Sequence, residues 1–189
     1  MDFSIRRKGV VLVFFVMLLG LLSTGCMTRR EWAPPRPFEV RLSREAVFAG
    51  DTIVVDVIGI SDSGKDKIVA AVDSGSYFSS SSSIRKEFIG TTPPLGRDFT
   101  FGPGTEQMAR ASQSLARRDS IWKFWKRNEV RHLVVAANMR LLEQTQTKSD
   151  PRMIVIPYNK YKLSAALRRS RLLEVKATPR GLSASPPVE

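Results

Sequence analysis

Two residues of the chain could carry nucleophilic, metal or redox chemistry by their type, and each is the only one of its kind. Cys26 is the single cysteine and His132 the single histidine. A catalytic triad needs its histidine beside a nucleophile, but His132 stands at the start of an apolar run, which favours a structural or surface role. The acidic residues are scattered among arginines rather than clustered as metal ligands. We therefore expect no catalytic residue, no metal and no cofactor, and a protein that is not an enzyme.

The residues before Cys26 predict what happens to its thiol. A basic cluster, Arg6-Arg7-Lys8, is followed by an uncharged run from Gly9 to Leu22 and then by small residues. A positive start, an apolar centre and a small-residue cleavage site form the layout of a secretory signal. Ser23-Thr24-Gly25-Cys26 resembles the lipobox of bacterial lipoproteins, in which cleavage occurs before a diacylglycerol-modified cysteine; Ser23 stands where leucine is usual. We expect residues 1–25 to be a signal peptide and Cys26 to be the lipidated residue.

An uncleaved membrane anchor is the alternative, because the uncharged stretch from Gly9 to Thr28 is about as long as a spanning helix requires. The small residues and the cysteine at its far end favour cleavage. In lipoproteins, the absence of aspartate after the cysteine, where Met27 stands here, implies transfer to the outer membrane. We expect an outer-membrane protein that faces the periplasm, held by diacylglycerol and an N-terminal acyl group such as palmitate.

The charge of the chain indicates an anionic partner. Lys and Arg total 30 against 18 acidic residues, and the formal net charge is +12. Loss of Asp2, Arg6, Arg7 and Lys8 with the signal peptide would leave +10. Nucleic acid, anionic lipid and an acidic protein all attract such a chain, but an exported protein rarely meets nucleic acid. We expect membrane and protein partners, no nucleic acid and no small-molecule substrate.

The 189 residues suffice for one ordinary globular domain. Three prolines make residues 26–37 a tether between the lipid and the domain. Residues 38–178 are predicted to form the domain, and the Pro/Ser-rich tail 179–189 is predicted to be disordered.

Alternation from Phe38 to Leu42 predicts a strand, and the β-branched run 52–60 predicts a central strand that pairs antiparallel with it. Helix is favoured over strand for residues 66–77, and Ser79–Ser83 reads as a loop. Residues 105–118 read as a connector or helix, and 143–149 as a polar loop. Further strands are predicted at 84–89, 98–101, 132–139, 152–156 and 172–177. Short strands with few helices predict a mostly β fold, an antiparallel β-sandwich with one or two short helices.

Two basic segments have competing interpretations. Ile121–Arg127 alternates aromatic and basic residues, which could grip a membrane interface, but a helix after Asp119 whose Trp122 and Trp125 close the sandwich is favoured. The cluster of Arg168, Arg169 and Arg171 is interpreted as a solvated face; if it binds, the ligand is an anionic headgroup or an acidic partner.

Several of these features together resemble the outer-membrane lipoprotein of type VI secretion systems. They are the lipobox, the proline-rich tether, a sandwich of this size, the Pro103-Gly104 turn and the strand Leu133-Val134-Val135-Ala136-Ala137. The serine run 79–83 and the segment 105–127 depart from the family pattern. The resemblance implies a transthyretin-like sandwich that binds the periplasmic domain of an inner-membrane protein through a loop between early strands. By position, the counterpart loop here consists of Ser61, Asp62, Ser63, Gly64, Lys65, Asp66 and Lys67.

The predicted function is that of a lipid-anchored periplasmic adaptor that tethers a secretion-type envelope complex to the outer membrane. The alternative is a basic envelope-binding lipoprotein that contacts anionic lipid or cell-wall polymer. Binding that weakens steeply with salt would favour the alternative.

Overall fold

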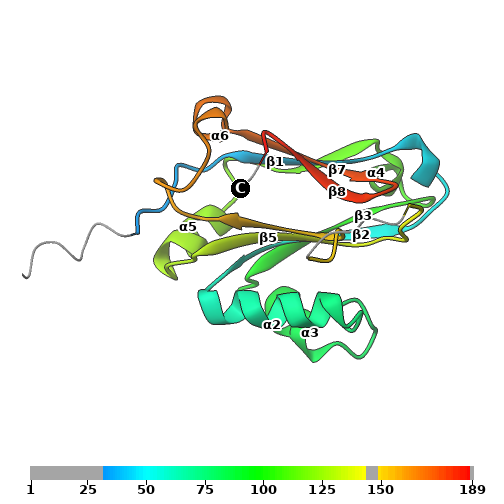
Figure 1. The fold of residues 1–189 in the computed structure, drawn as a ribbon, viewed down its shortest axis with the longest axis horizontal. Coiled ribbons are helices and arrows are strands. Elements are labelled where there is room, and N and C mark those ends of the chain that lie inside the picture. Colours follow the sequence, from blue (N-terminus) through cyan, green and yellow to red (C-terminus); the bar gives the residue numbers. More distant parts are fainter. Residues whose placement is uncertain (1–31, 144–148, 188–189) are drawn as a thin grey trace, which may run out of the picture. The chain divides into compact units, whose positions relative to one another are not determined.

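The computed structural model describes residues 32–143 and 149–187, and its compact unit begins at Pro34. Cys26 and the predicted signal peptide lie outside the described residues. The compact unit is built on two four-stranded sheets that face each other (Figure 1). The predicted mostly β sandwich is confirmed.

The first sheet has the strand order β4-β1-β7-β8 and is mixed. Its strands are β1 (Glu39–Arg44), β4 (Ser112–Leu115), β7 (Leu172–Thr178) and β8 (Gly181–Ser185). β1 pairs antiparallel with β4 but parallel with β7, from Glu39↔Leu172 to Arg44↔Ala177. Burial alternates along β1 and β7, so that one face of this sheet meets the core and the other meets solvent.

The second sheet has the order β3-β2-β5-β6 and is antiparallel throughout. Its strands are β2 (Ile53–Ile60), β3 (Gly96–Phe101), β5 (His132–Asn138) and β6 (Met153–Pro157). β2 and β5 are central, as predicted, and burial is nearly continuous along both. Continuous burial means that both faces of these strands are covered.

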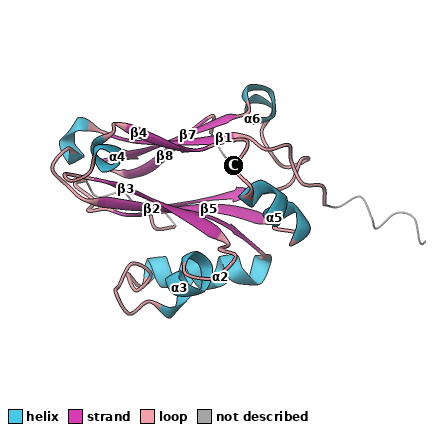
Figure 2. Cartoon of the chain, turned by 180° about the vertical axis from the view of Figure 1, so that it is seen from behind, coloured by secondary structure: helices cyan, strands magenta, loops and turns pink. Residues whose placement is uncertain are grey.

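Each face of the second sheet has its own apolar cluster. Val57 and Val135 face the first sheet and pack with Phe38, Leu42 and other residues of the inter-sheet core. The neighbouring residues along the same two strands, Ile58 and Val134, point the other way and pack with residues from two helices. Those helices, α2 (Asp62–Asp73) and α3 (Ser83–Ile89), form a third layer against the second sheet (Figure 2). Helix is therefore confirmed for residues 66–73 of the segment predicted at 66–77; α2 begins four residues earlier and ends at Asp73.

The remaining helices are short and close the ends of the sandwich. They are the 3-10 helix η2 (Ala46–Phe48), α4 (Glu106–Ala109), α5 (Ile121–Arg127) and α6 (Ala165–Ser170). The described residues thus contain more helices than the one or two expected from the sequence. α5 carries Trp122 and Trp125, both buried in the inter-sheet core, with Lys123 and Lys126 exposed. This confirms the favoured interpretation of the aromatic and basic segment.

The predicted pairing between strands 38–43 and 52–60 is wrong. β1 and β2 lie in different sheets, because η2 takes the chain across one end of the sandwich and buries Phe48 in the core. The strand predicted at 84–89 is also wrong, and the segment forms α3. Ser82 caps this helix by accepting a hydrogen bond from the Arg85 backbone N–H at 3.2 Å.

Two strands occur where the sequence predicted none. β4 lies within the predicted connector 105–118, where its polar residues pair with the edge of β1. β8 lies within the tail predicted to be disordered, which is therefore wrong for residues 181–185. Gly181 has a φ of 127°, which favours glycine, and the Thr178 hydroxyl donates to its carbonyl at 2.8 Å. This turn folds β8 back onto β7, with Leu182 packed against the core.

Candidate functional site

The segment predicted as a partner-binding loop, residues 61–67, forms the first two turns of α2 rather than a loop. Ser61 is the N-cap, and its hydroxyl accepts a hydrogen bond from the Gly64 backbone N–H at 3.2 Å. Gly64 is buried, and a Cβ at this position would lie 3.2 Å from the Ile60 Cβ. The serines and glycine that read as loop residues therefore serve as a helix cap and as a close contact with β2.

The beginning of α2 is tied to β5 by the only histidine of the chain. His132 Nε2 lies 2.6 Å from Asp62 Oδ1, and this hydrogen bond lowers the pKa of Asp62. His132 Nδ1 is buried and has no hydrogen-bond partner in the described part of the chain. The imidazole thus links β5 to a carboxylate of α2, a helix that lies earlier in the sequence.

The solvent-facing side of this first stretch of α2 is polar and of mixed charge. Ser63, Asp66 and Lys67 are exposed, whereas Ile68 is fully buried against the sheet. Lys67 Nζ also lies 3.6 Å from Glu87 Oε1 of α3. A mixed-charge surface on a fixed helix suits the recognition of a protein surface. We call the exposed side chains of residues 61–67 the α2 surface.

The helical layer is locked to the sheet by a buried charge that the sequence analysis missed. Asp56 is fully buried in β2, and Arg85 of α3 donates to it through Nε at 2.8 Å and Nη2 at 2.9 Å. The Tyr77 hydroxyl donates to Asp56 Oδ2 at 3.0 Å. Burial raises the pKa of Asp56, although the hydrogen bonds from Arg85 and Tyr77 work against that rise. A single aspartate inside a β-branched run was the sequence signal for such a network.

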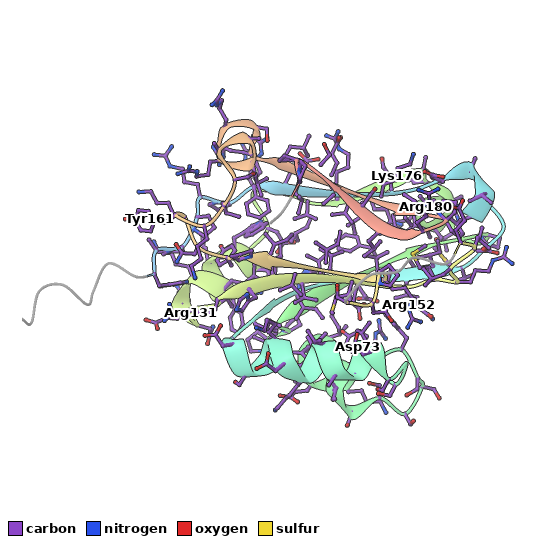
Figure 3. The ribbon with its side chains drawn as sticks, viewed as in Figure 1. Asp73, Arg131, Arg152, Tyr161, Lys176 and Arg180 are labelled. Atoms are coloured by element: carbon purple, nitrogen blue, oxygen red, sulfur yellow. The ribbon has the colours of Figure 1, made fainter. Side chains whose placement is uncertain are left out.

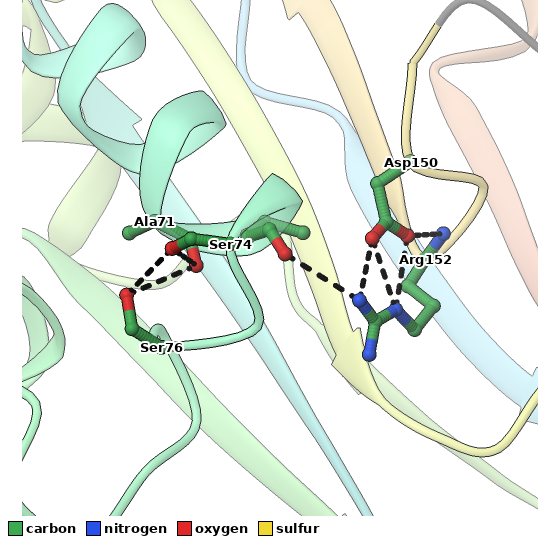
Figure 4. A network of polar contacts seen from close by, with 6 residues as sticks. Ala71, Ser74, Ser76, Asp150 and Arg152 are labelled. Atoms are coloured by element: carbon green, nitrogen blue, oxygen red, sulfur yellow. Dashed lines mark hydrogen bonds and ion pairs between the residues drawn. The ribbon is translucent and has the colours of Figure 1, made fainter.

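A second polar network holds the other end of α2 (Figure 4). Arg152, at the start of β6, donates through Nε to Asp150 at 2.9 Å and through Nη2 to the Val72 carbonyl at 3.4 Å. Burial raises the pKa of Asp150, but the hydrogen bonds from Arg152 outweigh it, and the pKa lies below its ordinary value. Hydrogen bonds therefore join both ends of α2 to the second sheet.

The end of the predicted tether is also fixed. Phe38 is buried, and its ring centroid lies 5.0 Å from that of Trp122. Arg171 donates to the Pro37 carbonyl through Nε at 3.3 Å and Nη2 at 2.9 Å. Arg171 ends α6 in the left-handed conformation with a φ of 54°. Of the predicted arginine cluster, Arg168 and Arg169 are solvated as expected, but Arg171 binds the tether.

Two kinds of feature are absent from the part of the chain that the structure describes. Over residues 32–143 and 149–187 no group of three or more histidine, cysteine or acidic side chains could hold a metal ion. In the same residues no helix is long and apolar enough to cross a membrane. What the arrangement provides is a sandwich with one fixed helical surface and one fixed point of entry for the chain.

The chain is similar, at low identity, to two solved structures. The type VI secretion system lipoprotein TssJ1 from Pseudomonas aeruginosa is 12% identical, with 83% of this chain and 100% of that chain covered and a TM-score of 0.40. Serratia marcescens Lip, a membrane-bound component of the type VI secretion system, is 14% identical, with 80% and 100% covered and a TM-score of 0.38. No protein-family model matches the chain, and no characterised protein sequence does.

Proposed function

We propose that the protein is a lipid-anchored periplasmic adaptor that tethers a secretion-type envelope complex to the outer membrane. Acylation of Cys26 supplies the anchor, and the α2 surface contacts the periplasmic domain of an inner-membrane protein. The secretion-type complex is suggested by the family resemblance of the sequence motifs.

One observation carries the proposal: the chain is fixed to the sandwich at Pro37 and Phe38, at the end of the predicted tether. The contacts of Phe38 with Trp122 and of Arg171 with Pro37 lie directly after the proline-rich tether. These contacts fix the point at which the tether joins the sandwich, so the length of the tether sets how far the sandwich can lie from the membrane. Confinement near the membrane raises the effective concentration of the binding surface, which strengthens a modest contact.

The α2 surface is the second support. It is exposed and polar, yet it is held by Asp62–His132 at one end and by Arg152–Val72 at the other. A surface ordered before binding loses little conformational entropy when a partner binds. Such a surface suits an adaptor that must stay bound to the complex it holds.

The test is capture of the partner by full-length, tagged protein extracted from membranes in mild detergent. We expect one inner-membrane protein at near-stoichiometric recovery, and loss of that protein when Ser63→Arg and Asp66→Arg place two bulky cations on the α2 surface. The matched control makes the same kinds of change on the solvent face of the first sheet, Ser183→Arg and Glu174→Arg, and should retain the partner. Equal recovery by the α2 variant and the control would contradict the proposal.

A further inference from the structure

A hollow of about 420 Å³ lies where the first folded residues meet α6. Pro34, Pro35 and Phe38 line it from the tether side, and Leu163 lines it from the segment between β6 and α6. Phe38 and Leu163 are 2% and 5% exposed, so the floor of the hollow is apolar. The hollow is therefore built partly from the segment that leads to the predicted anchor.

Every charged residue that lines this hollow is a cation. They are Arg36, Lys160, Arg168 and Arg171. Arg171 is occupied by the Pro37 carbonyl, whereas Arg36, Lys160 and Arg168 form no ion pair with any carboxylate in residues 32–143 and 149–187. Three cations from three different segments, gathered without a counter-charge over an apolar floor, suit an anionic group that is attached to an apolar body.

An exposed aromatic side chain stands beside the hollow. Tyr161 is 59% exposed, lies between Lys160 and Lys162 in sequence, and has Lys160 Nζ 5.5 Å from its ring centroid. Tyrosine flanked by lysines is the composition of segments that rest at a membrane interface. In Figure 3, Tyr161 lies at the end of the sandwich away from Lys176 and Arg180. We call Arg36, Lys160–Lys162, Arg168 and Arg169 the tether-end basic face.

We propose that the tether-end basic face binds the phosphate headgroups of anionic phospholipids in the leaflet that holds the anchor. A phosphate enters the hollow, and Tyr161 rests among the headgroups. The proposal rests on the proposed function for its anchor at Cys26. A fully extended chain from Cys26 to Pro34 spans at most about 28 Å, which keeps this face within reach of that leaflet. The contact would fix which side of the sandwich is presented to the periplasm.

The experiment uses full-length, acylated protein reconstituted into vesicles. Cys26 is the only cysteine, so after acylation a new cysteine is the sole reactive thiol. Ala166→Cys, on an exposed position of α6, carries a fluorophore next to the basic face. Val47→Cys in η2 is the control label, since Val47 is 51% exposed. The light-blue segment that contains η2 lies at the end of the sandwich away from α6 (Figure 1). Brominated acyl chains quench a fluorophore that approaches the bilayer.

We expect quenching of the residue 166 label, but not of the residue 47 label, in vesicles that contain phosphatidylglycerol. Quenching should fall in pure phosphatidylcholine and at high salt. The triple variant Arg36→Gln, Lys160→Gln, Arg168→Gln should lower the ratio of docked to undocked protein about 100-fold, since each cation near an anionic surface contributes about fivefold. The matched triple variant Arg140→Gln, Lys176→Gln, Arg180→Gln removes the same charge elsewhere and should dock as the wild type does.

Quenching that is indifferent to phosphatidylglycerol, or equal docking by the two triple variants, would overturn the proposal. Partner capture with the same proteins separates this result from failure of the proposed function. We expect the basic-face triple variant to retain the inner-membrane partner and the α2 variant to retain docking. If the basic-face variant loses the partner while no lipid dependence exists, this face binds an acidic protein, and the lipid inference is wrong.

Discussion

The outer faces of the two sheets are built on different principles. On the first sheet, β1 and β7 alternate buried and exposed residues, and the outer face carries charged side chains such as Arg41, Glu174 and Lys176. On the second sheet, β2 and β5 are buried on both faces, because α2 and α3 cover the outer one (Figure 2). A sheet with one face open to solvent needs only an alternation of apolar and polar residues along its strands. A sheet that is apolar on both faces also needs a helical layer to cover its outer face.

The comparison extends to the ion pairs on the two faces. Arg41 and Glu174 join β1 and β7 in the open at 3.2 Å, with half of the Glu174 side chain exposed. Asp56 and Arg85 join β2 and α3 under cover at 2.8 Å, with Asp56 fully buried. An arginine and a carboxylate thus meet in water on one sheet and away from it on the other. We therefore expect that breaking the covered pair lowers the free energy of unfolding more than breaking the open pair.

The largest effect is expected at the covered pair. Asp56→Ala leaves Arg85 and the Tyr77 hydroxyl without their acceptor beneath the helical layer, and should lower the free energy of unfolding by about 3–5 kcal/mol. Urea unfolding followed by circular dichroism measures the loss. A loss below about 1 kcal/mol would mean that the buried pair is no stronger than a surface pair.

The apolar side of the cover gives the next effect. Ile68→Ala removes a fully buried side chain between α2 and the second sheet, and should cost about 2–4 kcal/mol through lost burial and the cavity left behind. Val69→Ala, at a partly buried position one residue on, is the matched control and should cost less. Similar losses for the two variants in thermal unfolding would show that α2 is not fixed as described.

The covered face should also respond to acid. Hydrogen bonds from Arg152 lower the pKa of Asp150 in the folded protein. The ionised carboxylate therefore stabilises the fold at any pH above the pKa of aspartate in the unfolded chain, which is about 4. This stabilisation is lost as the pH falls through the pKa that Asp150 has in the folded protein. Asp150→Asn should cost about 1–2 kcal/mol at neutral pH. Unfolding titrations should show this difference between variant and wild type fading in acid. A difference that stays constant with pH would contradict the assignment.

The smallest effect is expected on the open face. Glu174→Ala removes the acceptor of Arg41 across β1 and β7, and should change the free energy of unfolding by less than about 1 kcal/mol because water replaces the lost contact. Urea unfolding beside Asp56→Ala makes the comparison direct. Equal losses at the two sites would remove the distinction between the faces.

The same contrast explains what the sequence could predict. Alternation at 38–42 and the β-branched run 52–60 identified β1 and β2, because those patterns reflect burial directly. The apolar residues in the segment 84–89 suit either a strand or a helix. The segment forms a helix because Ser82 caps it and because its apolar side chains cover the outer face of the second sheet. β4 and β8 are strands only because neighbouring edges pair with them, which local sequence does not encode.

The segment proposed to bind a partner differs in form from the loop that was predicted. Ser61–Lys67 reads as a loop because serine, aspartate and glycine favour turns, yet the apolar residues that follow bury against β2 and extend the helix back to Ser61. The role of Arg171 at Pro37 depends on a contact between residues far apart in sequence, so no local pattern could reveal it.

The most direct test of the central claim is mass spectrometry of the mature protein purified from membranes. The account predicts an N-terminal peptide that begins at Cys26 and carries diacylglycerol on the thiol and an acyl chain on the amine. A free thiol at residue 26, or a mature chain that retains residues 1–25, would contradict it.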